Sequence, residues 1–197
     1  IAMISNILLS SKIDKYQQLI EADNNAVAQI GALNLQFKTQ VQEWKNVLLR
    51  GHQTKDREKY WTKFTQQHEL VQQQAQNILQ LELTDTIKEQ VIKFRRVHAS
   101  LMNEYEEGKQ TFIDTQFDHK NADSVVRGID RAPGQILEEL VDQVQTQLKA
   151  KSTNLESQAR QSQTVSIIAI LFALISSILF ANLYMNKRVI KPIVTLI

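Results

Sequence analysis

The sequence predicts an all-α protein: an antiparallel up-down four-helix bundle with long helices, continuous with a C-terminal transmembrane helix. Three observations support this fold class. The 197 residues include only five glycines and two prolines, and so few helix breakers favour long helices over strands. Apolar residues recur at heptad spacing along several stretches. The segment 164–184 contains no charged residue and matches the roughly 20 apolar residues that a membrane-spanning helix needs.

Charge, cysteine content and motifs exclude several kinds of site. The formal net charge of +2 gives no basic footprint for nucleic acid. The chain has no cysteine, which excludes a disulfide, a thiolate nucleophile and a cysteine zinc site. It also lacks a glycine-rich phosphate loop, a nucleophile elbow and an H-E-x-x-H pair. We therefore expect no enzymatic activity in these residues, no cofactor and no nucleic-acid partner.

Residues 1–11 are uncharged but too few to span a membrane. We interpret them as the end of a first transmembrane helix, with a signal peptide as the alternative. Because the chain begins at Ile1 and stops at Ile197, we expect it to be a fragment of a longer protein.

The first long helix is predicted to begin at Lys12 and to end before Gly51. Its apolar seam consists of Tyr16, Ile20, Val27, Ile30, Phe37, Val41, Trp44 and Leu48. Thr54 is predicted to cap a second helix with Asp56 in its first turn, and that helix is expected to end near Leu83. The stripe of the second helix consists of Trp61, Phe64, His68, Val71, Ala75 and Ile78.

Thr84 or Asp85 is predicted to cap the third helix. Its stripe consists of Ile87, Val91, Phe94, His98, Leu101, Tyr105 and Phe112, with His119 as a further candidate. Connections this short make neighbouring helices antiparallel.

The third turn has two candidate positions, residues 119–123 and 130–134. Residues 12–50 rise about 57 Å at about 1.5 Å per residue, and a fourth helix must cover a similar height. A helix from Ala122 to Gln163 does so. We therefore place the turn near Asn121 and interpret Pro133 and Gly134 as a kink within the fourth helix.

The fourth helix is predicted to continue into a transmembrane helix at residues 164–186. Its apolar positions are Ile136, Leu140, Val144, Leu148 and Leu155. The first charges after the apolar segment are Lys187, Arg188 and Lys191, and the positive-inside bias then places residues 12–163 outside the cytoplasm. Pro192 and the apolar residues around it predict the start of another helical module in residues 187–197.

These features together resemble the sensing half of a bacterial methyl-accepting chemotaxis protein, a transmembrane chemoreceptor. Three stretches carry the resemblance: FKTQVQEWKNVLLRG at 37–51, ADSVVRGIDRAP at 122–133, and VIKPIVTLI at 189–197, which is similar to the start of a HAMP linker. The resemblance implies a homodimer in the bacterial inner membrane, with residues 12–163 as a periplasmic ligand-binding domain. It also implies a cytoplasmic signalling part that controls a histidine kinase.

Two other interpretations stay open. The same sensor and HAMP halves also precede histidine kinases and diguanylate cyclases, which would change the output. A membrane-tethered coiled-coil protein that acts in adhesion or fusion, without a signalling output, would also show heptads beside a membrane segment.

His68 and His98 are predicted to lie at a similar level on facing helices. Two such histidines could ligate a metal or a haem in the bundle interior. The alternative, which we favour, is that glutamines such as Gln67 or Gln74 hydrogen-bond them.

The candidate ligand site lies in the third of the bundle farthest from the membrane. Arg127 and Arg131 are four residues apart, which places them on one face of the predicted fourth helix, level with Trp44 to Arg50. Trp44 and Trp61 are expected to lie opposite each other about the turn at Gly51. Guanidinium groups bordered by indole rings could hold a small anion such as the carboxylate of an amino acid or an organic acid. The alternative is a solvated face with Arg131 paired to Asp130 or Asp123.

Overall fold

The structure is a computed structural model that describes residues 2–185, with side chains described for residues 16, 18 and 20–185. All of its regular secondary structure over that range is helical, which confirms the predicted all-α class. The helices are α1 (Ala2–Arg50), α2 (Thr54–Ile78), α3 (Asp85–Asp114), α4 (His119–Val126) and α5 (Arg131–Met185).

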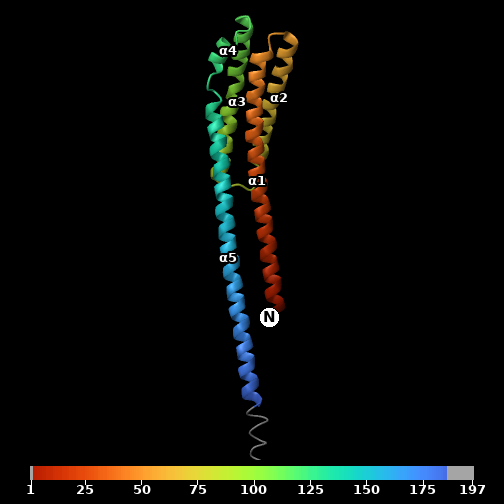
Figure 1. The fold of residues 1–197 in the computed structure, drawn as a ribbon, viewed down its shortest axis with the longest axis vertical. Helices are drawn as coiled ribbons and strands as arrows, with labels where there is room; N and C mark the ends of the chain where they lie inside the picture. The colour runs from red at the N-terminus through yellow and green to blue at the C-terminus, as the bar shows by residue number, and fades with distance from the viewer. Residues whose placement is uncertain (1, 186–197) are drawn as a thin grey trace, which may run out of the picture. The chain divides into compact units, whose positions relative to one another are not determined.

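The chain divides into two compact units, Ile1–Lys149 and Ala150–Ile197. Within the first unit the α1–α2 turn and the α3–α4 turn lie at the same end, whereas the α2–α3 connection lies away from that end, beside the middle of α1 (Figure 1). This arrangement is an antiparallel up-down helical bundle. The fourth helical segment of the bundle is formed by α4 together with the first part of α5.

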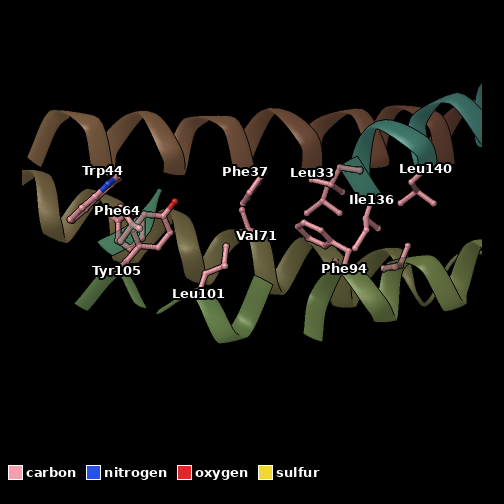
Figure 2. Close-up of a cluster of buried hydrophobic side chains, with 14 of the residues drawn as sticks. Leu33, Phe37, Trp44, Phe64, Val71, Phe94, Leu101, Tyr105, Ile136 and Leu140 are labelled. Carbon is pink, nitrogen blue, oxygen red and sulfur yellow. The ribbon is translucent and has the colours of Figure 1, made fainter. Parts of the chain in front are cut away.

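The core of the bundle is a column of apolar side chains from all of these helices (Figure 2). In α1 the predicted Ile30, Phe37, Trp44 and Leu48 are buried, whereas Tyr16, Ile20, Val27 and Val41 are only half-buried. The fully buried positions that the predicted seam missed are Leu33, Gln40 and Val47. They lie one residue before or three to four residues from the predicted ones, so the buried stripe is rotated slightly around α1.

The α2 and α3 stripes agree closely with the prediction. Phe64, Val71, Ala75 and Ile78 of α2 are buried, and so is every predicted α3 position from Ile87 to Phe112. Thr84 is the N-cap of α3, as expected, although its side chain makes no capping bond. Two details differ: α2 ends at Ile78 rather than near Leu83, and Gln53 rather than Thr54 is its N-cap.

The third turn lies earlier than predicted. α3 ends at Asp114 and α4 begins at His119, so the reversal falls before Asn121. Gln116 and Phe117 reverse the chain with φ angles of 54° and 68°, a region that non-glycine residues seldom adopt. The Phe117 N–H closes the turn by donating to the Phe112 carbonyl at 2.7 Å.

A break interrupts the predicted continuous fourth helix. α4 ends at Val126 and α5 begins at Arg131. Gly128, between them, has a φ angle of 84°, which glycine adopts without the steric cost that a side chain would bring. Pro133 is buried in the first turn of α5, where a helix does not need its missing N–H. The prediction of a kink at Pro133 and Gly134 was therefore wrong, because Gly128 makes the break and Pro133 helps to begin the next helix.

The second unit contains the C-terminal part of α5. This helix is long and apolar enough to cross a membrane, with a mean hydropathy of 2.6 over its most apolar window, of which 0% is buried within the chain. The apolar segment predicted from the sequence lies in this helix. The predicted HAMP start at 187–197 and the side chains of the predicted membrane-helix end at 1–11 lie outside the part that the structure describes.

Candidate functional site

Both tryptophans of the predicted ligand site pack against Phe64. Trp44 is 3% exposed and meets Phe64 and Tyr105 edge-on, with ring centroids 6.4 and 5.2 Å apart (Figure 2). Trp61 is half-buried and stacks on Phe64 at 5.0 Å. Trp44 is therefore a core residue, and Trp61 is the tryptophan that a ligand could reach.

Gly108 of α3 permits the close packing around Trp44. A Cβ atom built on Gly108 would lie 3.1 and 3.2 Å from two indole carbons of Trp44 and 2.8 Å from Val126 Cγ1. The absence of a side chain at this position lets α1, α3 and α4 approach one another around the indole.

The structure does not place Arg127 and Arg131 on one helical face. Arg127 is the C-cap of α4, whereas Arg131 is the first residue of α5 beyond the break. Arg127 is exposed and pairs with Asp123, with 3.0 Å between Nη2 and Oδ2. Arg131 is also exposed, and its guanidinium lies beside Gly128. Neither arginine is enclosed, so any ligand held here would be bound at the surface of one chain or between two copies.

Arg50, the remaining predicted residue, belongs to a group that we call the distal basic surface: Arg50, Lys59, Tyr60, Trp61, Lys63 and Lys109. Arg50 donates to the Tyr60 hydroxyl at 3.0 Å. The ammonium groups of Lys59 and Lys63 lie 5.3 and 5.8 Å from the Tyr60 ring centroid. Lys109 lies 4.6 Å from the Trp61 ring and 3.9 Å from a Glu58 carboxylate oxygen. Cations arranged around aromatic rings in this way could hold an anion with an apolar part.

Arg57 is a buried arginine at the distal end that the sequence analysis missed. It is 7% exposed and donates to the Gly51 carbonyl at 3.0 Å and to the Thr54 hydroxyl at 3.2 Å. Its guanidinium also lies 5.1 Å from the Phe117 ring centroid. The Gly51 carbonyl belongs to the negative end of α1, which favours a cation. Arg57 therefore ties the α1–α2 turn to the α3–α4 turn.

A chain of polar side chains crosses the middle of the core. Gln40 Nε2 lies 3.2 Å from His68 Nδ1, and Gln40 Oε1 lies 2.6 Å from His98 Nε2. Gln72 Nε2 lies 2.6 Å from His98 Nδ1 and 3.1 Å from the Arg95 carbonyl. The two imidazole rings stack with centroids 4.4 Å apart. We call Gln40, His68, Gln72 and His98 the histidine–glutamine chain.

The expected proximity of the two histidines is therefore confirmed, but different glutamines hold them. The sequence analysis named Gln67 and Gln74, whereas Gln40 of α1 and Gln72 of α2 make the contacts. Gln74 instead donates to the carbonyl of Gln29. Gln40 could have been found from the sequence, because it lies between Phe37 and Trp44 at core spacing. A fully buried amide must find partners.

Burial keeps both rings neutral near pH 7. Desolvation, followed by the neighbouring His68 ring, lowers the pKa of His98 to about 3. Desolvation also lowers the pKa of His68, and the charge of Glu69 opposes that change. Elsewhere in the core, burial raises the pKa of Tyr105, and Asp130 and Glu104 raise it further. The Tyr105 hydroxyl therefore stays protonated.

The described residues hold no group of three or more histidine, cysteine, aspartate or glutamate side chains that could bind a metal ion. In the histidine–glutamine chain, both His98 nitrogens and His68 Nδ1 already face glutamine amides. A metal ion here would have to displace those amides. The arrangement therefore favours the hydrogen-bonding interpretation of His68 and His98.

Comparison with known proteins places the chain beside a bacterial chemoreceptor. No family model matches the chain, and no solved structure matches it. The methyl-accepting chemotaxis protein CtpH of Pseudomonas aeruginosa is 31% identical to it over 192 residues, which are 96% of this chain and 33% of that protein. The chain thus spans about a third of the length of this relative. The resemblance to the methyl-accepting chemotaxis proteins that the sequence predicts is confirmed, and the chain is similar to a portion of such a receptor.

Proposed function

We propose that this chain is the sensor module of a transmembrane chemoreceptor. It binds a small ligand outside the cytoplasm and passes a small helix displacement across the membrane to a cytoplasmic signalling part. The observation that carries the proposal is the similarity to a chemotaxis receptor over 96% of the chain. In this proposal residues 12–163 are periplasmic, the protein is a homodimer in the bacterial inner membrane, and residues 187–197 begin a HAMP linker.

Helix α5 supports the proposed route of the signal. It contributes Ile136, Leu140 and Val144 to the bundle core, and the same helix contains the candidate membrane span. A ligand that favours one of two helix arrangements can shift the population of that arrangement. A displacement of the distal part of α5 would then reach the membrane through continuous helix.

The distal end of the bundle is the proposed ligand site. Arg127 and Arg131 remain candidates because their guanidinium groups are exposed, and Arg50 and Trp61 belong to the neighbouring distal basic surface. A carboxylate of an amino acid or organic acid suits guanidinium donors. Because Arg127 already pairs with Asp123, a ligand carboxylate would compete with that aspartate. Trp44 takes part only by supporting the fold from the core.

The test joins residues 1–197 to the cytoplasmic half of a characterised chemoreceptor and places this hybrid in motile bacteria that lack other receptors. A panel of amino acids and organic acids is then screened for changes in swimming reversals. We expect at least one compound to act. A hybrid that reaches the membrane but answers no compound would count against direct ligand sensing.

A matched pair of variants tests the role of α5. Glu156 is exposed and lies between the bundle core and the apolar segment. Glu156→Pro should abolish the response, since an internal proline costs a helix about 3 kcal/mol and kinks it. Glu156→Ala removes the same charge but keeps the helix, so its response should resemble the wild type. Equal responses from the two variants would refute transmission through α5.

The same hybrid separates the rival functions. A tethered adhesion or fusion protein without a signalling output would not control swimming. A ligand-dependent swimming response would therefore exclude that interpretation. A histidine kinase or diguanylate cyclase output would leave the sensor module unchanged, and the residues that follow 197 in the whole protein would identify it.

A further inference from the structure

The histidine–glutamine chain has a defined hydrogen-bond direction. Gln40 Oε1 can only accept, so the His98 Nε2 that faces it at 2.6 Å must carry the ring proton. His98 Nδ1 is then an acceptor for Gln72 Nε2. Gln40 Nε2 donates to His68 Nδ1, which must likewise be unprotonated. The donors therefore run in one order: Gln72 to His98, His98 to Gln40, and Gln40 to His68.

A proton added to His68 reverses this order. It would occupy Nδ1 and face the amino group of Gln40, so two donors would oppose each other. Rotation of the Gln40 amide would relieve that clash by turning Oε1 toward His68. The Gln40 amino group would then face His98 Nε2, and the His98 proton would have to move to Nδ1. One proton enters from solvent, and the second ring only changes tautomer.

The last step of the reversal cannot be completed without loss. Gln72 Nε2 donates both to His98 Nδ1 and to the Arg95 carbonyl of α3. If Gln72 turned its oxygen toward a protonated Nδ1, that oxygen would also face the Arg95 carbonyl, and the bond between α2 and α3 would be lost. A buried polar group without a partner is costly. Protonation of the histidine–glutamine chain therefore favours a different packing of α2 against α3. Helix α1 would move with α2, because Gln40 of α1 is hydrogen-bonded to His68 of α2.

The surroundings leave His68 as the proton acceptor. His68 is half-buried, whereas His98 and Gln40 are fully buried. From α2 itself, the Glu69 carboxylate favours a charge on His68. From α3, the His98 ring stacks on it, and Arg95 offers its carbonyl to Gln72 while its guanidinium bonds to Gln76.

The remaining helices place no buried charge here among the contacts that the structure gives. α1 faces the rings with the neutral Gln40 and Phe37. α5 approaches Phe37 at Gly134, where an added Cβ would lie 3.8 Å from the Phe37 ring. The nearby Lys38 and Glu138 form an exposed ion pair at 3.8 Å. Two stacked rings cannot both carry a charge cheaply.

We propose that this module has a second input, external pH, and that His68 is the group that receives the proton. The histidine–glutamine chain converts protonation of His68 into a shift of α1 and α2 against α3. This inference extends the proposed sensor function to another stimulus, and its signalling consequence depends on that function.

Ring-nitrogen NMR of histidine-labelled residues 1–197 in nanodiscs tests the first step without any signalling partner. As His68 gains its proton below the ordinary histidine pKa, we expect the proton of His98 to move from Nε2 to Nδ1 with the same midpoint. His68→Gln assigns the His68 signals, and His119→Gln, at an exposed position, is the matched control. Unchanged His98 nitrogens throughout the His68 titration would overturn the inference.

Gln40→Glu provides a second variant that keeps a hydrogen-bonding side chain in place. A carboxylate between the two rings should raise the midpoint of the His68 titration by roughly one to three pH units, the range for an adjacent opposite charge. A midpoint that does not move would show that Gln40 is not coupled to His68, and would overturn the inference even if His68→Gln failed to fold.

The hybrid receptor tests the consequence. A step from about pH 7.5, above the ordinary histidine pKa, to a pH below the His68 midpoint found by NMR should change swimming in the wild type and in His119→Gln but not in His68→Gln. A hybrid that answers a ligand but not pH would overturn this inference and leave the proposed function standing. A hybrid that responds neither to any ligand nor to pH would overturn both the proposed sensor function and the proposed pH input.

Discussion

Replacing Trp44 by alanine should strongly destabilise the bundle. The indole is 3% exposed and contacts Phe64 and Tyr105 edge-on. Truncating a large buried aromatic to alanine costs about 3–5 kcal/mol, because transfer energy is lost and a cavity remains. For a bundle of this size, each kcal/mol shifts the melting temperature by about 2–4 °C. We therefore expect the variant to melt about 6–20 °C below the wild type, by the same scaling.

Gly108 supplies an internal check on this reasoning. A methyl group at Gly108 would meet the indole at 3.1 Å and Val126 at 2.8 Å. Gly108→Ala should gain about 1 kcal/mol of helix propensity but lose about 1–3 kcal/mol through overpacking. In the Trp44→Ala background the indole is absent and only the contact with Val126 remains, so Gly108→Ala should cost less there than in the wild type. The two substitutions should then be less harmful together than their sum by about 1–3 kcal/mol, within the range for residues in contact.

The assay is urea unfolding of the segment 12–160, followed by far-ultraviolet circular dichroism, on the two single variants, the double variant and Trp44→Phe. Trp44 Nε1 is buried without a hydrogen-bond partner among the described residues. Trp44→Phe therefore loses no hydrogen bond and should cost clearly less than Trp44→Ala. A loss below about 1 kcal/mol in Trp44→Ala, the ordinary scale of surface changes, would refute the assignment of Trp44 to the core. Strictly additive effects of Trp44→Ala and Gly108→Ala would refute the contact between them.

Three further predictions follow from the bundle and its titratable groups. The segment 12–160 alone should be soluble, almost wholly helical and weakly dimeric, because each helix buries one stripe and leaves a polar outer face; a substantial strand signal in circular dichroism would contradict this. His98 has a pKa of about 3 when folded against 6.5 when unfolded, so the unfolded chain takes up the proton first and stability falls as the pH drops from 6.5 toward 3. The loss should approach about 4–5 kcal/mol at about 1.36 kcal/mol per pKa unit, and urea titrations at several pH values should show a shallower fall in His98→Gln. Arg127→Ala and Arg131→Ala should leave the melting temperature almost unchanged but weaken binding of a carboxylate ligand found in the screen roughly ten- to a hundredfold. Lysine at either position should restore only part of the lost affinity. Calorimetry that finds wild-type affinity in the alanine variants would exclude these arginines from the ligand site.

Periodicity predicted the fold well because burial in a bundle follows the helix repeat. Every predicted α3 position from Ile87 to Phe112 is buried, since this helix has one sharply defined apolar stripe. In α1 the apolar stripe is wider: Val27 and Val41 were predicted to be in the core but are half-buried, whereas Leu33 and Val47 were not predicted and are buried. The choice between them decided whether Gln40 was placed in the core or on the surface. The apolar residues alone could not make that choice, because the deciding residue is polar; the available signal was the spacing of Gln40, three residues after Phe37 and four before Trp44.

The turns were predicted less well, and they control the arrangement of the candidate ligand site. Comparing helix lengths places a reversal only to within a few residues, and no such comparison detects the left-handed φ angles of Gln116 and Phe117 or of Gly128. The break at Gly128 separates Arg127 from Arg131, so their spacing of four residues does not put them on one helical face. Each arginine instead lies at the end of its own helix, with Gly128 between them. A ligand that bridges Arg127 and Arg131 would hold α4 against the first turn of α5. Gly128→Ala disfavours the positive φ angle at this junction. A loss of coupling between ligand binding and the swimming response in that variant would indicate that the junction takes part in the signal.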